Sequence, residues 1–237
     1  MITHGLKRAL SITALVIAAA LTGCGSSTAV AGHNTVDRTS VCAQVSDCHV
    51  VATVDVDGDH RTDQVGWRQL GQDAVQIRVR TAGGALLLHR VDVQLWFGGG
   101  AWGGAARVDG MPGAELLVGS EQGAHTPMYT MLTYRDEALV IESSPSPLSR
   151  RWQVDAAYGD YMGWSRTLVD GHAAMTQTIV YRNDDGKSFT GDSVRYVWKV
   201  DRWHRTTRAS VSFPTEKGAA AMAGFHVKGL DTFPGLR

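Results

Sequence analysis

The sequence predicts an all-β domain built from antiparallel hairpins, and three observations carry this prediction. From Cys48 onward the hydrophobic pattern has mostly a period of two, as expected for strands with one buried face. The apolar runs are rich in Val, Ile, Tyr, Thr and Trp, which favour strands. Short segments containing Gly, Asp and Asn separate the runs, and these residues tolerate the positive φ of hairpin turns.

Seven runs show the strand pattern most clearly. They cover residues 49–56, 74–81, 85–97, 128–135, 138–143, 173–182 and 193–200. Three connecting segments have hairpin chemistry, namely Thr81–Ala85, Arg135–Ala138 and Arg182–Ser188. The Ala-rich stretch Glu216–Phe225 is the one that has a helical composition, and its two glycines weaken that prediction.

The first residues have the layout of a secretory signal peptide. Lys7 and Arg8 precede an apolar run from Ala9 to Leu21 that is too short to span a bilayer comfortably. We therefore expect residues 1–23 to be removed, and we exclude them from the fold.

The end of this run, "LTGC" at Leu21–Cys24, resembles the lipobox of bacterial lipoproteins. The resemblance implies that Cys24 is diacylated and that the peptide before it is cleaved; the alternative is an ordinary signal peptide with a chance cysteine. Residues 24–40 are small and polar, as expected for a lipidated, flexible tether. Because two acyl chains hold a protein stably, the expected location is the extracytoplasmic face of the cell membrane, anchored by lipid at Cys24.

The remaining residues, 41–237, are expected to form a single β domain. It contains two cysteines, Cys42 and Cys48. Two remaining cysteines in an exported protein most often pair, so we expect a disulfide that closes a short loop before the first strand. Two free or metal-bound thiols are the alternative.

Charge gives little information about partners: 23 basic residues balance 23 acidic ones, and 21 basic residues (23 − 2) remain once Lys7 and Arg8 are lost. No basic stripe suggests nucleic acid.

The stretch "VDVDGDHRTDQV", Val54–Val65, concentrates four aspartates in one short loop. Like charges this close repel one another unless a cation lies between them. Ca²⁺ takes several oxygen ligands at short distance, and Gly58 allows the chain to turn sharply around an ion. The expected ligands are the carboxylates of Asp55, Asp57, Asp59 and Asp63 and the backbone carbonyl of Arg61. The alternative is a solvated Asp/Gly turn without an ion.

This loop resembles the calcium loop of the FG-GAP repeat, a β-hairpin unit of integrin α-chain propellers and of bacterial VCBS-type repeat proteins. The resemblance covers the four aspartates and the strand that begins at Val65. It implies a Ca²⁺ cofactor and, because the chain is too short for a full propeller, a partial propeller-like or sandwich arrangement of hairpins. His60 stands where the family usually has glycine, and at a position that needs positive φ it would reduce affinity.

A second copy of the motif lies further along the chain. Residues 54–67 align with residues 106–119, so that Asp57 falls near Asp109 and Asp63 near Glu115. Most ligand positions are replaced in this copy, by Arg107, Met111 and Gly113, and we expect it to have kept the turn and lost the metal. "YGDYMGW", 158–164, is a fainter third echo.

These features favour a binding or structural module, not an enzyme, in which calcium rigidifies a loop and the partner is an unknown envelope protein or glycan. Two alternatives stay open. An envelope hydrolase could assemble its site around His125 and Asp160. A glycan-binding module could present Trp102, Trp152 and Trp164 to a sugar face, although large aromatics more often fill a small β core.

Overall fold

The computed structural model describes residues 40–94 and 100–231, and within these ranges the fold is all-β, as predicted. It contains antiparallel sheets and a single short helix. The predicted signal peptide, residues 1–23, and nearly all of the predicted tether, residues 24–40, lie outside the described residues. In the part of the chain that is described, no helix is long and apolar enough to span a bilayer.

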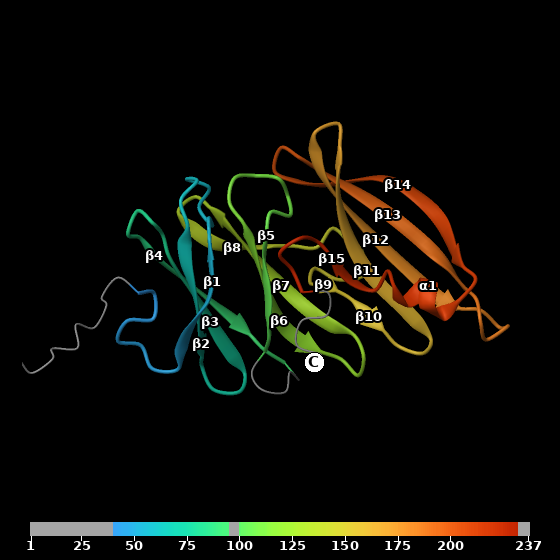
Figure 1. Cartoon of the computed structure of the whole chain (residues 1–237), viewed down its shortest axis with the longest axis horizontal. Helices are drawn as coiled ribbons and strands as arrows, with labels where there is room; N and C mark the ends of the chain where they lie inside the picture. Colours follow the sequence, from blue (N-terminus) through green and yellow to red (C-terminus); the bar gives the residue numbers. More distant parts are fainter. Residues whose placement is uncertain (1–39, 95–99, 232–237) are drawn as a thin grey trace, which may run out of the picture. The chain divides into compact units, whose positions relative to one another are not determined.

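The first sheet is a four-stranded meander in which neighbouring strands pair antiparallel (Figure 1). Its strands are β1 (Cys48–Val54), β2 (Asp63–Gln69), β3 (Ala74–Arg80) and β4 (Leu86–Asp92). The period-two pattern places Val65, Ile77 and Val79 in the core, each fully buried. The predicted run 49–56 stops being a strand at Val54, because the acidic loop begins at Asp55.

The second sheet repeats this strand order. It contains β5 (Trp102–Ala106), β6 (Glu115–Gln122), β7 (Pro127–Arg135) and β8 (Ala138–Glu142), and the short β9 (Trp152–Gln153) pairs with β7. The acidic loop connects the first two strands of the first sheet, and its aligned copy connects the first two strands of the second. The repeat seen in the sequence is therefore a repeat of topology.

The third sheet is longer-stranded. It contains β10 (Asp155–Ala156), β11 (Asp160–Val169), β12 (His172–Arg182), β13 (Phe189–Lys199) and β14 (Arg202–Phe213), with β15 (Gly224–His226) parallel to β11. The helix α1 spans only Glu216–Ala220, capped by the Thr215 side chain. The predicted helix over 216–225 is thus too long: Gly224 has φ +84°, outside helical geometry, and pairs with Gly163 in the sheet.

One hydrophobic core cluster draws residues from all three sheets. Its members include Ile77 of the first sheet, Leu117 and Tyr129 of the second, and Trp164 of the third. All buried apolar residues of the described chain lie between Val41 and Val227. The described part of the chain therefore carries its own core.

Cys42 and Cys48 form a disulfide, which confirms the predicted pairing, with 5.4 Å between their Cα atoms. The bridge and Val41 lie over Gly66 of β2, where an added Cβ would come within 3.1 Å of Cys42 Sγ. The missing side chain at Gly66 therefore leaves room for the segment that leads into β1 to pack on the outward face of the first sheet.

Candidate metal centre

The acidic loop between β1 and β2 closes around the carboxylate of Asp63, which is 1% exposed. Asp63 Oδ2 accepts hydrogen bonds from the backbone N–H groups of Val56 (2.7 Å) and Asp57 (3.3 Å), and Oδ1 accepts one from Ala82 in the β3–β4 turn (2.8 Å). Gly58 has φ +82° and His60 has φ +67°. His60 therefore occupies the left-handed conformation that favours glycine. This conformation costs a histidine some conformational energy, as expected from the FG-GAP pattern, which usually has glycine at this position.

Three of the four aspartates converge. Asp55, Asp57 and Asp63 each offer a carboxylate oxygen, and these oxygens all lie within 4.8 Å of one another. Asp55 is positioned by the N–H groups of Gly58 (2.7 Å) and His60 (3.2 Å), which donate to its two oxygens. Burial raises the pKa of Asp57, and the neighbouring carboxylates raise it further, since each added negative charge disfavours ionisation.

Asp59 does not join this group. Its carboxylate accepts hydrogen bonds from the Arg61 side chain, with Nη2 at 2.7 Å, and from the Arg61 backbone N–H at 2.8 Å. These bonds hold the pKa of Asp59 below its ordinary value. Both side chains are partly exposed, so their ion pair is screened by solvent and contributes little to stability. The role predicted for the Arg61 carbonyl stays a prediction.

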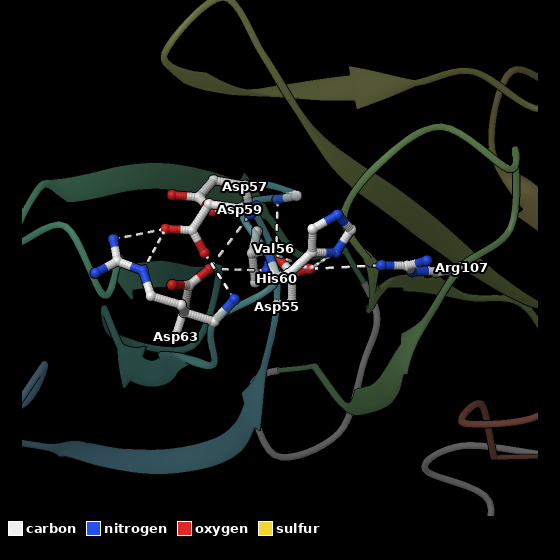
Figure 2. Close-up of polar contacts among 9 residues, drawn as sticks. Asp55, Val56, Asp57, Asp59, His60, Asp63 and Arg107 are labelled. Carbon is white, nitrogen blue, oxygen red and sulfur yellow. Dashed lines mark hydrogen bonds and ion pairs between the residues drawn. The ribbon is translucent and has the colours of Figure 1, made fainter.

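Positive charge approaches the cluster from the second sheet. Arg107 Nη2 lies 3.4 Å from Asp55 Oδ2, and the His60 ring lies on the same side (Figure 2). This arrangement offsets part of the negative charge, but Arg107 is about half exposed and its ion pair is correspondingly weak. The inner carboxylates of Asp57 and Asp63 have no ion pair among the described residues.

The donor set fits a hard divalent cation. Ca²⁺ is held by six to eight oxygens at about 2.3–2.6 Å, and carboxylate oxygens within 4.8 Å of one another can share one ion. Asp55, Asp57 and Asp63 would hold it, and Asp59, the Arg61 carbonyl and water would complete the shell. Bound there, a divalent ion would neutralise the converging carboxylates.

The second copy has kept the turn. The Val108 N–H donates to Glu115 Oε2 (2.5 Å), as the Val56 N–H does to Asp63, and the Met111 N–H donates to Asp109 (2.7 Å). Gly110 has φ +83°, which matches Gly58. The third stretch, residues 158–164, differs from the two loops. Asp160 begins the second strand of its sheet, β11, but the turn before it is closed by a backbone hydrogen bond, in which the Ala157 N–H donates to the Asp160 carbonyl.

The two loops pack directly against one another. The Ala114 N–H donates to the Asp55 carbonyl (2.9 Å), and an added Cβ at Gly58 would lie 2.5 Å from Pro112 Cβ. The acidic loop is therefore a joint between the first two sheets, and an ion that fixes it would fix that joint.

Sequence reasoning missed a second carboxylate cluster, Asp109, Glu115 and Glu142, which lies buried beneath the second loop. Arg135 forms an ion pair with Asp109, and Thr133 donates to Glu115 (3.1 Å). The indole N–H of Trp203 donates to Glu142 Oε1 (2.9 Å), whereas no described residue donates to Glu142 Oε2. No sequence signal points to Glu142, because the β7–β8 register brings it to this site by pairing it with Met131.

Burial raises the pKa of each of these acids. The pKa of Glu115 rises to about 7, and that of Glu142 rises well above its ordinary value; burial is the main cause and the neighbouring carboxylates add to it. A raised pKa in the folded state means that the fold holds protons that the unfolded chain releases. Stability from this cluster is therefore greatest below about pH 4.5 and is lost as pH rises toward 7.

We expect Glu142→Gln to stabilise the domain at pH 8 by about 1–3 kcal/mol and to change stability little at pH 5. Glutamine removes the charge, keeps an acceptor for Trp203 and supplies an amide donor to the neighbouring acids. Urea unfolding at both pH values checks this, with the exposed Glu137→Gln as control. Equal destabilisation by Glu142→Gln at both pH values would contradict it.

His125 does meet a carboxylate. Its Nδ1 lies 3.0 Å from both oxygens of the buried Asp155, which raises the pKa of His125, and Asp160 lies in the same group. Thr126 Oγ1 donates to Asp155 and lies 3.4 Å from the same ring nitrogen. A catalytic triad places its nucleophile on the other ring nitrogen, so Thr126 is not positioned as one. The ring is also half exposed.

The proposed sugar platform is wrong for two of its three tryptophans. Trp152 and Trp164 are fully buried, with ring centroids 4.8 Å apart, and belong to the core. Neither can stack on an external ligand. Trp102 is half-buried and packs against the same core.

Comparison with known proteins adds no family to these observations. No family model matches the chain, and no curated protein or solved structure matches it.

Proposed function

We propose that this chain is an exported protein of the cell envelope, anchored by lipid at Cys24 on the extracytoplasmic face of the membrane. Its domain, residues 41–237, acts as a binding or structural module for an envelope protein or glycan, held rigid by calcium in a loop of the FG-GAP type. The convergence of Asp55, Asp57 and Asp63 carries the calcium assignment.

Calcium in this proposal has a mechanical role. The loop that it closes contacts the second sheet through the Asp55 carbonyl and through Gly58. Neutralising the carboxylates removes a repulsion that otherwise strains this joint. The bound ion would thereby stiffen the packing of the first two sheets and present a fixed surface to the partner.

Calcium at a hundred times its dissociation constant should stabilise the domain by about 2.7 kcal/mol, which for this length raises the melting midpoint by about 5–10 °C. The substitution Asp57→Asn should abolish most of this shift, since it removes one central charge while keeping an oxygen for the Asp59 N–H. Thermal unfolding followed by circular dichroism, with calcium and with chelator, measures both.

The matched control is Asp170→Asn, an exposed turn residue with φ +51° between β11 and β12. It makes the same chemical change outside the cluster and should retain the full calcium shift. Identical melting of the parent chain in calcium and in chelator would overturn the calcium assignment.

A further inference from the structure

The outward face of the first sheet combines arginines with exposed apolar side chains. Strand pairing sets them in rows across β1 to β4: one row runs Val50, Gly66, Arg78, Leu88, and the next runs Thr53, Gln64, Arg80, Leu86. A third row, Cys48, Arg68, Gln76, Arg90, completes the face. We call Val50, Arg68, Arg78, Arg80, Leu86 and Leu88 the basic face.

Its arginines lack acidic partners. Arg68, Arg78 and Arg80 form no ion pair with any described residue, and the Nε atoms of Arg68 and Arg80 have no hydrogen-bond partner. Burial lowers the pKa of Arg78, and the adjacent charges of Arg68 and Arg80 lower it further. Arg78 itself is buried, but its charge and those of the half-buried Arg68 and Arg80 lie on one face without an ion pair to any described residue, and such a face attracts anions to its accessible arginines, Arg68 and Arg80.

The same face exposes large apolar side chains. Val50 is 46% exposed, Leu86 40% and Leu88 49%, and all three flank the arginines in the rows above. Isolated exposed apolar residues are ordinary, but apolar and basic side chains interspersed on one face are typical of surfaces that lie in the headgroup region of a bilayer.

The chain reaches the domain at this face. Val41 packs over Gly66, its carbonyl accepts from Arg78 Nε (3.1 Å), and its N–H donates to Gln64 (3.0 Å). Val41 lies only 17 positions (41 − 24) after Cys24. Even a fully extended chain of this length reaches at most about 60 Å.

We infer that the basic face docks on the anionic phospholipid headgroups of the membrane that holds the lipid anchor. The inference rests on the proposed anchoring at Cys24, which keeps this face near the bilayer. Arg68 and Arg80 flank the point where the chain arrives and contact lipid phosphates, while Leu86, Leu88 and Val50 enter the headgroup boundary. Docking fixes the orientation of the domain relative to the membrane.

The test uses the chain from residue 24 with Cys24→Ser, so that binding does not depend on acylation. Co-sedimentation is measured in chelator with vesicles of phosphatidylcholine alone and with equal parts of phosphatidylglycerol. We expect binding to the anionic vesicles only, weakened by salt. The double variant Arg68→Gln, Arg80→Gln should bind about 10- to 30-fold more weakly.

The matched control, Arg202→Gln with Arg205→Gln, removes the same charge from exposed positions on β14 and should bind like the parent. Thermal unfolding of each variant excludes a loss of fold. Equal binding by the two double variants, or retention on an acidic polysaccharide without binding to anionic vesicles, would overturn the inference. Detergent partitioning of the full chain tests the lipid anchor at Cys24 separately. A failure of the proposed anchoring can therefore be distinguished from a failure of the proposed docking.

Discussion

Gly113→Ala should destabilise the domain by about 3 kcal/mol, one of the largest effects of a single methyl group in this chain. Gly113 has φ +95°, a conformation that costs an L-residue about 1 kcal/mol. An added Cβ would also overlap the carbonyl oxygen of Val56 in the acidic loop. Relieving that overlap requires the two loops to separate, at a further cost of about 1–3 kcal/mol. Urea unfolding measures the sum.

Gly84→Ala separates the two contributions. Gly84 has φ +93°, nearly the same as Gly113, but an added Cβ there meets nothing within 4 Å. It should therefore cost only the conformational part, about 1 kcal/mol. If the two alanine variants lose equal stability, the close packing of the acidic loop on the second sheet contributes nothing to stability. The acidic loop would then not act as a joint between the first two sheets.

Asp63→Ala should cost about 3–5 kcal/mol even in the presence of chelator. The Asp63 carboxylate accepts from three backbone N–H groups, those of Val56, Asp57 and Ala82. Alanine leaves the buried Val56 N–H without a partner, at a cost of about 1–3 kcal/mol, and removes the two part-buried bonds from Asp57 and Ala82, at about 0.5–1.5 kcal/mol each. Unfolding in chelator isolates this structural role from any effect of calcium.

Asp59→Ala is the matched change within the same loop. Asp59 is exposed and its main partner is the exposed Arg61, so its loss should cost less than about 1 kcal/mol. If Asp63→Ala lowers the free energy of unfolding as little as Asp59→Ala does, the loop does not depend on the buried carboxylate.

Much of this architecture follows from local sequence pattern. The alternation of apolar residues predicts core-facing positions of β3 such as Ile77 and Val79, because a period of two is a property of neighbouring residues alone. The acidic loop and its second copy are predictable for the same reason, since Gly58 and Gly110 stand at positions that need positive φ. The disulfide joins residues only six positions apart.

What could not be predicted depends on pairing between distant strands. β14 is largely exposed at a sheet edge and carries His204, Arg205 and Arg208, so it lacks the alternating apolar pattern of a strand. β15 ends the predicted helix because its partner, β11, is 61 residues earlier at the Gly163–Gly224 pair (224 − 163). Glu142 reaches Asp109 and Glu115 only through strand register and core packing.

In the acidic loop, too, the sequence predicts the local pattern but not the contacts between side chains. Spacing places four aspartates together, but it does not say which of them face one another. Asp55, Asp57 and Asp63 converge, whereas Asp59 turns to Arg61, two residues away. Arg107, which approaches Asp55 from 52 residues along the chain, is outside the reach of any local pattern.

Isothermal titration of the domain with calcium measures whether the acidic loop binds an ion. We expect one site per chain, lost in Asp57→Asn and retained in Asp170→Asn. Absence of any saturable calcium binding by the parent domain, or undiminished binding by Asp57→Asn, would contradict this expectation.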